Sequence, residues 1–167
     1  MKVITVKQPW ASLIVEGLKD IENRTWQTKY RGRVLIHSAV KPDIEFKNRC
    51  LVGLYGIGMT EEMILSANKL SFKWDAFLNE NGLIIGSVEI VDCVINHESI
   101  WAERTYQYEL ESKLTGECAK GKAIYNWVLS NPIKFPEPIP AKGKLSFWDY
   151  PNILSEPEEN DCELFCP

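Results

Sequence analysis

Between residues 8 and 39 the sequence concentrates side chains whose placement is costly unless they have a role. These are Trp10, Lys19, Glu22, Arg24, Trp26, Arg31, Arg33 and His37. A tryptophan face can stack on a planar ring, which stabilises a bound base by about 1 to 3 kcal/mol. Arg24 offers a planar fork for a carbonyl or a phosphate, and Glu22 can accept a hydrogen bond from an exocyclic amine. These residue types suit recognition of a nucleobase in a cleft.

The segment from Lys19 to Trp26 follows a period of two, which is typical of a strand. In such a strand Glu22, Arg24 and Trp26 share one face. Glu22 and Arg24 could form an ion pair of structural value, or line a ligand cleft together. Lys19 either stands at the mouth of the cleft or turns inward. If it turns inward, burial and the nearby Arg24 would both lower the pKa of its amine, which would favour its use as a base.

Three further charged residues could extend this site. Arg31 and Arg33 lie in a turn, where they are either solvated or contact a phosphate beside the cleft. Glu89 lies among apolar residues, where an unpaired acid is expensive. We therefore expect Glu89 either to face solvent at the end of the barrel or to meet a partner such as Lys19 or Arg24.

Other reactive residue types form no convincing constellation. His37 lies in an apolar stretch and is predicted to be a core residue rather than a ligand. The spacing of Ser12, Cys93 and the two histidines does not indicate a nucleophile triad. Five cysteines at scattered positions indicate neither a disulfide framework nor a zinc site. We expect no metal and no cofactor.

Short elements must position these side chains. Strands are predicted at 3–6, 19–26, 34–39, 83–95, 124–129 and 144–148, and helices at 9–17, at 42–51 and after Thr60. Segment 131–142 holds four prolines and is predicted to be a rigid, extended loop. Early helices, few strands and Gly or Pro at the corners predict an α+β fold with a small, strongly bent sheet or barrel.

The length of 167 residues predicts one domain, which we place at 1–150, followed by an acidic tail at 151–167. The net charge of -4 argues at first against a nucleic-acid partner. Five of the acids lie after Pro151, however, so the body carries 19 basic against 18 acidic residues. This balance disfavours long, charge-driven duplex binding and favours a short single strand or a nucleotide.

The start of the chain lacks the unbroken apolar stretch of a signal peptide, and no apolar run approaches the ~20 residues of a membrane helix. We therefore expect a cytoplasmic protein without a membrane partner.

Several blocks of the sequence resemble a known family. Residues 8–14 read QPWASLI, residues 17–26 read GLKDIENRTW and residues 30–33 read YRGR. Together with 82–94 and 131–144, they resemble the ASCH domain (activating signal cointegrator homology) family over roughly residues 3 to 150. The resemblance implies a fold related to the PUA domain, a small β-barrel with helices packed at its openings. It also implies binding of RNA or a modified nucleotide in a cleft lined by Gly-x-Lys-x-x-Glu-x-Arg, with a role in RNA metabolism.

Some members of that family are enzymes. One branch removes the acetyl group from N(4)-acetylcytidine and reads Gly-x-Lys-Thr-x-Thr-x-Arg, with the lysine and the second threonine catalytic. Another member has been described as a ribonuclease. In this sequence Asp20 and Glu22 stand at the threonine positions, so an acyl-threonine intermediate does not carry over. A hydrolase would instead use Glu22 as a general base toward water, with Lys19 or Arg24 stabilising the oxyanion.

Three hypotheses follow from the sequence. The first is a binding module for single-stranded RNA, a nucleotide or a nucleoside, whose cleft is lined by Trp10, Lys19, Glu22, Arg24 and Trp26. The second is a hydrolase, an amidohydrolase on acetylcytidine-like nucleosides or a ribonuclease, with Lys19 and Glu22 catalytic. The third is a module that holds a protein partner through the proline-rich segment or the acidic tail.

Overall fold

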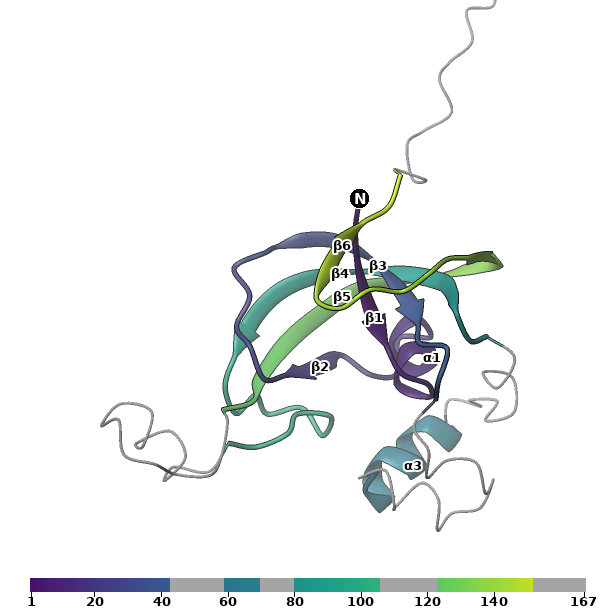
Figure 1. Cartoon of the computed structure of the whole chain (residues 1–167). Coiled ribbons are helices and arrows are strands. Elements are labelled where there is room, and N and C mark those ends of the chain that lie inside the picture. Colours follow the sequence, from purple (N-terminus) through teal and green to yellow (C-terminus); the bar gives the residue numbers. More distant parts are fainter. Residues whose placement is uncertain (43–58, 70–79, 106–122, 152–167) are drawn as a thin grey trace, which may run out of the picture.

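The structure is a computed structural model that describes residues 1–42, 59–69, 80–105 and 123–151. Within these ranges the chain forms a strongly curved sheet with a helix at one opening and a second helix beside it (Figure 1). The strands are β1 (Lys2–Val6), β2 (Ile21–Arg24), β3 (Gly32–Ser38), β4 (Leu83–Val94), β5 (Tyr125–Pro140) and β6 (Phe147–Asp149), and the helices are α1 (Trp10–Val15) and α3 (Glu61–Lys69).

The six strands lie in the order β2-β5-β4-β3-β1-β6. β1 runs parallel to β3, and the other neighbouring strands are antiparallel. The long strands β4 and β5 bend the sheet into a half-barrel, so its two outermost strands, β2 and β6, come round without pairing (Figure 1). We call the gap between β2 and the β1–β6 pair the seam. The predicted α+β fold, a small bent barrel with helices at its openings, is confirmed.

The hollow of the half-barrel is filled by apolar side chains that alternate along the strands. Trp127 of β5 is completely buried at its centre, and Ile14 and Val15 of α1 close the cluster from one opening. A second cluster joins α1, β2 and α3 through Leu13, Ile21, Met59, Ile64 and Trp101. β2 is therefore held on its outer face by apolar packing through Ile21.

Most predicted elements are found, with shifted ends. β2 is shorter than expected because it ends at Arg24, so Trp26 is not on the strand and does not share its face. The predicted last strand begins later, at Phe147, and residues 144–146 form a loop. Thr60 caps α3 as expected, since its Oγ1 accepts a hydrogen bond of 3.3 Å from the Met63 N–H.

The proline-rich segment differs from the prediction. It is extended, but it is the second half of β5 rather than a loop, and it pairs with β4 from Ile133↔Ser87 to Pro140↔Leu83. β2 covers only residues 125–128 of β5, so this half is an edge of the sheet. An edge strand tolerates proline because its outward-facing N–H groups have no partner to lose.

Two predicted features fall outside the described residues. These are the helix at 42–51, of which only Pro42 is described, and the acidic tail after Pro151. The division into a domain at 1–150 and a tail at 151–167 stays a prediction.

Candidate functional site

A pocket of about 400 Å³ lies at the seam, where the pairing of β6 with β1 ends. Its walls come from the end of β1 and the start of α1, from β2, and from the loop before β6. The lining residues are Thr5, Val6, Lys7, Trp10, Glu22, Asn23, Arg24, Ala39, Lys144, Leu145 and Ser146. This volume suits a nucleoside-sized ligand, since small-molecule sites usually occupy about 300 to 1,000 Å³.

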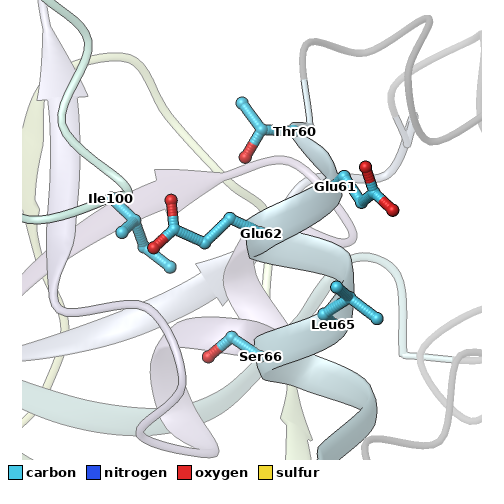
Figure 2. A pocket seen from close by; sticks show the side chains of 6 residues that line it. All are labelled: Thr60, Glu61, Glu62, Leu65, Ser66 and Ile100. Carbon is cyan, nitrogen blue, oxygen red and sulfur yellow. The ribbon is translucent and has the colours of Figure 1, made fainter.

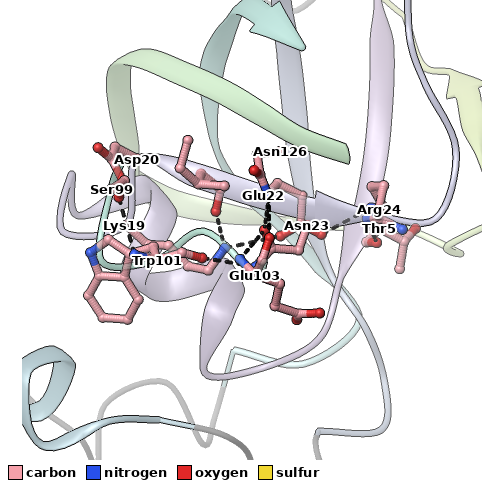
Figure 3. A network of polar contacts seen from close by, with 11 residues as sticks. Thr5, Lys19, Asp20, Glu22, Asn23, Arg24, Ser99, Trp101, Glu103 and Asn126 are labelled. Carbon is pink, nitrogen blue, oxygen red and sulfur yellow. Dashed lines mark hydrogen bonds and ion pairs between the residues drawn. The ribbon is translucent and has the colours of Figure 1, made fainter. Parts of the chain in front are cut away.

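Arg24 bridges the seam with its side chain. Its Nη2 donates a hydrogen bond of 2.8 Å to the main-chain oxygen of Thr5, so the guanidinium links β2 to β1 where no strand pairing does (Figure 3). The guanidinium carbon lies 5.9 Å from the ring centroid of Trp127, within reach of a cation–π contact. Its other terminal nitrogen, Nη1, has no hydrogen bond to the part of the chain that the structure describes and remains available to a ligand.

Glu22 is held between two cations. Its Oε1 lies 3.0 Å from Nε of Arg24, an ion pair without the alignment of a hydrogen bond. Its Oε2 lies 3.5 Å from Nζ of Lys19. The carboxylate is buried yet reaches the pocket wall. The predicted ion pair of Glu22 with Arg24 is present, and it lines a pocket.

Lys19 turns inward and is 5% exposed, so the inward alternative of the sequence analysis is correct. Its Nζ donates to the main-chain oxygen of Ile21 and lies 5.9 Å from the ring centroid of Trp10. Burial lowers the pKa of Lys19, and Glu22 opposes that shift most strongly. The expected lowering by Arg24 is not found, because the charged groups acting on Lys19 are acids. Lys19 supports the pocket from behind and does not line it.

A buried polar network anchors β2 from its outer face (Figure 3). The Asn23 side chain donates to Trp101 O at 2.9 Å and accepts from the Glu103 N–H at 3.2 Å. Asn126 of β5, fully buried, donates to Asn23 Oδ1 at 2.9 Å and to Glu103 O at 3.1 Å. The side chains of Asn23 and Asn126 thus fasten residues 101–103 to the strand that carries Glu22 and Arg24. Neither asparagine was predicted as part of the site. Asn126 offered a signal, because it lies between Tyr125 and Trp127 in a strand, whereas Asn23 lies between two charged residues and offered none.

The two tryptophans of the motif have different surroundings. Trp10 is half-buried and lines the pocket. Trp26 packs edge-on against Trp127, with ring centroids 4.6 Å apart, and Trp127 stacks on Phe147 at 5.3 Å. The structure therefore brings Trp10 together with Glu22 and Arg24, and it places Trp26 in an aromatic cluster of the core.

Arg31, Arg33 and Glu89 lie outside the pocket lining. Arg33 pairs with Glu89 at 2.9 Å, and Asn131 donates to the same carboxylate at 2.8 Å. The hydrogen bond from Asn131, together with Arg33, lowers the pKa of Glu89. Arg31 pairs with Asp92 at 2.9 Å. Glu89 thus meets a cation, but that cation is Arg33 rather than Lys19 or Arg24.

The loop that forms the third wall of the pocket was not predicted as part of the site. Leu145 is 95% exposed at the pocket rim, and Ser146 has a positive φ of 59°. The main-chain oxygen of Lys144 accepts from Thr5 Oγ1 at 3.0 Å, which ties the loop to β1. No local pattern in the sequence indicates this loop, because the exposure of Leu145 and the left-handed main chain of Ser146 appear only in the structure.

His37 is a buried core residue, as predicted, and it supports this loop. Its Nε2 lies 3.0 Å from Ala141 O, while Nδ1 is buried and has no hydrogen-bond partner among the described residues. A Cβ atom added to Gly143 would lie 2.4 Å from Cε1 of the ring, so the imidazole fills the space beneath the loop. Burial lowers the pKa of His37.

This lowered pKa predicts acid sensitivity. Between the lowered value and about 6.5, the unfolded chain binds more protons at His37 than the folded chain, so stability falls as pH falls through that window. We expect the free energy of unfolding, measured in urea, to decrease from about pH 7 to about pH 5, and His37→Gln to flatten that slope. An unchanged slope in His37→Gln would contradict the assignment.

A second pocket, of about 660 Å³, lies beside α3 (Figure 2). Its lining is Thr60, Glu61, Glu62, Leu65, Ser66 and Ile100. The charged groups of this lining are two exposed glutamates in the first turn of the helix, where acids are common because of the helix dipole. The described residues of this lining include neither a cation nor an aromatic ring, so the seam pocket is the better candidate site.

Comparison with known proteins agrees with the motif. The family model of the ASCH domain matches residues 4–139. Activating signal cointegrator 1 of Homo sapiens is 25% identical over 145 residues, and that of Mus musculus is 24% identical, in each case over 87% of this chain. This chain spans about a fifth of the length of those relatives, since the match covers 21% of each. The chain belongs to the ASCH domain family, a family associated with RNA binding.

Among solved structures, a mutant of the ASCH protein ZmASCH from Zymomonas mobilis aligns with a TM-score of 0.44 and 12% identity, over 83% of this chain and 74% of that one. Within the described ranges, no helix is long and apolar enough to cross a membrane. The same residues contain no cluster of three or more histidines, cysteines or acids that could hold a metal ion.

Proposed function

We propose that this chain binds single-stranded RNA, a nucleotide or a nucleoside, modified or not, in the seam pocket. The observation that carries the proposal is the convergence of Trp10, Glu22 and Arg24 on one pocket. Each supplies a different part of base recognition, namely a π-face, an acceptor and a cationic donor. The lysine that holds Glu22 lies behind the wall and leaves the pocket open.

Within this proposal the base stacks on Trp10, and its polar edge meets Glu22 and Nη1 of Arg24. Lys7 and Lys144 bring positive charge to the same pocket, where a phosphate of the ligand would lie. Arg31 and Arg33 could extend the path of a longer strand, and this role stays a prediction because both are engaged in ion pairs.

Replacing Arg24 by glutamine tests the proposal. A hydrogen bond to a charged group contributes about 1.5 to 3 kcal/mol, so Arg24→Gln should weaken binding between about tenfold and a hundredfold. Binding is measured by anisotropy of labelled single-stranded RNA oligonucleotides and by calorimetry with nucleoside monophosphates. Arg104→Gln removes an exposed arginine outside the pocket lining and should bind as the wild type does. If the wild type binds none of these ligands, or if both variants bind equally well, the proposal is wrong.

A hydrolase is the second candidate, and the lowered pKa of Lys19 beside Glu22 is what favours it. In that case water would add to the amide carbonyl of an acetylated cytidine, and acetate and cytidine would be released. Lys19 does not reach the pocket, however, and each oxygen of Glu22 is engaged by a cation, whereas a general base needs an oxygen that contacts the attacking water. We therefore expect chromatography to find no conversion of N(4)-acetylcytidine or of RNA. If the wild type converts one of them and Glu22→Gln abolishes that turnover, the hydrolase becomes the better-supported function.

A further inference from the structure

The main-chain N–H and C=O of Asn23 point in a different direction from its side chain. β2 pairs with β5 through Ile21↔Val128, Glu22↔Trp127 and Asn23↔Asn126, and Leu129 N–H donates to Asp20 O at 2.8 Å. Hydrogen-bonded pairs alternate along antiparallel strands. Asp20, Glu22 and Arg24 therefore direct their main-chain groups toward β5, and Ile21 and Asn23 direct theirs away from it.

The direction away from β5 leads into the seam. No strand described in the structure pairs with that side of β2. Ile21 O is capped by Nζ of Lys19. The N–H and C=O of Asn23 have no such cap among the hydrogen bonds of the described chain, and Asn23 lines the pocket. Its side chain is bound on the other face, to Trp101, Glu103 and Asn126, so the main chain is what Asn23 presents to a ligand.

We propose that the main-chain N–H and C=O of Asn23 read the hydrogen-bonding edge of the bound base. This inference rests on the proposed function and deepens it. A peptide N–H and C=O on one side of a strand offer a donor and an acceptor in nearly one plane, which complements a base edge with an adjacent acceptor and donor. Glu22 and Arg24 flank this pair from the neighbouring positions.

The same geometry disfavours an extended peptide as the ligand. A peptide that adds a strand to a sheet needs free main-chain groups at every second residue of the edge. On β2 the main-chain oxygen of Ile21 already accepts a hydrogen bond from Lys19, and the Arg24 side chain crosses the seam to Thr5. One open donor and acceptor pair remains, which suits one planar base edge and not a strand.

The class of ligand follows from this arrangement. The ligand must present a donor beside an acceptor, because the Asn23 C=O needs a donor and its N–H needs an acceptor. The Watson–Crick edge of every base offers such a pair, and in uridine N3–H is its donor. Methylation at N3 of uridine replaces the donor by a methyl group without adding charge. We expect 3-methyluridine to bind at least about tenfold more weakly than uridine, while changes at the ribose have smaller effects.

Amide NMR of the full chain tests the assignment directly. In the free protein the amide of Asn23 should exchange rapidly with solvent, whereas those of Glu22 and Arg24, bonded to β5, should be protected. On titration with CMP, UMP, AMP and GMP, the probe that binds should shift the Asn23 amide downfield and slow its exchange. Glu22 and Arg24 are internal controls on the same strand.

The outcomes separate this inference from the proposed function. An Asn23 amide protected in the free protein, or one that neither shifts nor gains protection while a probe binds in the pocket, would overturn the inference and leave nucleotide binding intact. Equal affinity for uridine and 3-methyluridine would do the same. If calorimetry detects no binding of any probe, the proposed function fails, and this inference fails with it.

Discussion

Replacement of Lys19 by methionine is expected to lower the free energy of unfolding by about 3 kcal/mol, because removing one partner of a buried ion pair leaves the other charge poorly compensated. Methionine has nearly the volume of lysine and can fill its space beside Trp10. It cannot donate to Ile21 O, and it leaves Glu22 with Arg24 as its remaining cationic neighbour. Urea unfolding followed by circular dichroism measures the loss.

Two comparisons show whether the loss comes from the buried pair. Lys2→Met breaks the exposed pair of Lys2 with Asp149 and should change stability little. Lys19→Met/Glu22→Gln also removes the negative charge that lost one of its two cationic partners, so it should be more stable than Lys19→Met alone. If Lys19→Met were as stable as Lys2→Met, the buried ion pair of Lys19 with Glu22 would not stabilise the fold.

The second large effect is expected from Gly86→Ala in β4. A Cβ atom at this position would lie 2.3 Å from Ile133 O and 2.8 Å from Val15 Cγ1, and real Cβ atoms do not approach other atoms so closely. The main chain of β5 and helix α1 must both move to admit it. Overpacking of a core usually costs about 1 to 3 kcal/mol, and contact with main-chain atoms places this variant at about 3 kcal/mol.

A double variant apportions that cost. Val15→Ala removes the Cγ1 atom that the new methyl group would meet, but it leaves Ile133 O in place. The destabilisation of Gly86→Ala/Val15→Ala should therefore be smaller than the sum of the two single effects by about 1 kcal/mol. Urea unfolding of the wild type, the two single variants and the double variant measures these effects. If the two single destabilisations simply add, Val15 of α1 does not press against Gly86.

The local pattern around the motif was sufficient to predict much of the site. The period of two placed Glu22 and Arg24 on one face, and the structure joins them as an ion pair in a pocket wall. The order of strands and helices also followed from local signals, because turns, caps and alternation are determined by neighbouring residues. The same pattern does not decide between the two orientations of Lys19, since the burial of a lysine depends on which distant residues cover it.

The remainder depended on contacts between distant parts of the chain. Arg33 pairs with Glu89 across two strands, and nothing near either residue in the sequence identifies the other. Trp26 lies beyond β2 because Trp127 and Phe147 provide its packing. The prolines of 131–142 indicated an extended chain, but only the neighbouring β4 makes that segment a strand. The role that we propose for the main chain of Asn23 follows from the register in which β2 pairs with β5, and the sequence does not contain that register.

Because the pocket lies at the seam, its width depends on the curvature of the whole sheet. Two of its walls, β2 and β1, are separated along the sheet by the three strands β5, β4 and β3 and thus by four strand pairings. Each pair of neighbouring strands contributes its own twist, so small changes at any of the four pairings accumulate into the distance across the gap. A substitution at a bulge of β4, which contributes no residue to the pocket lining, can therefore widen or narrow the pocket. Selection for a particular ligand would act on the bend of the whole half-barrel as much as on the residues that touch it.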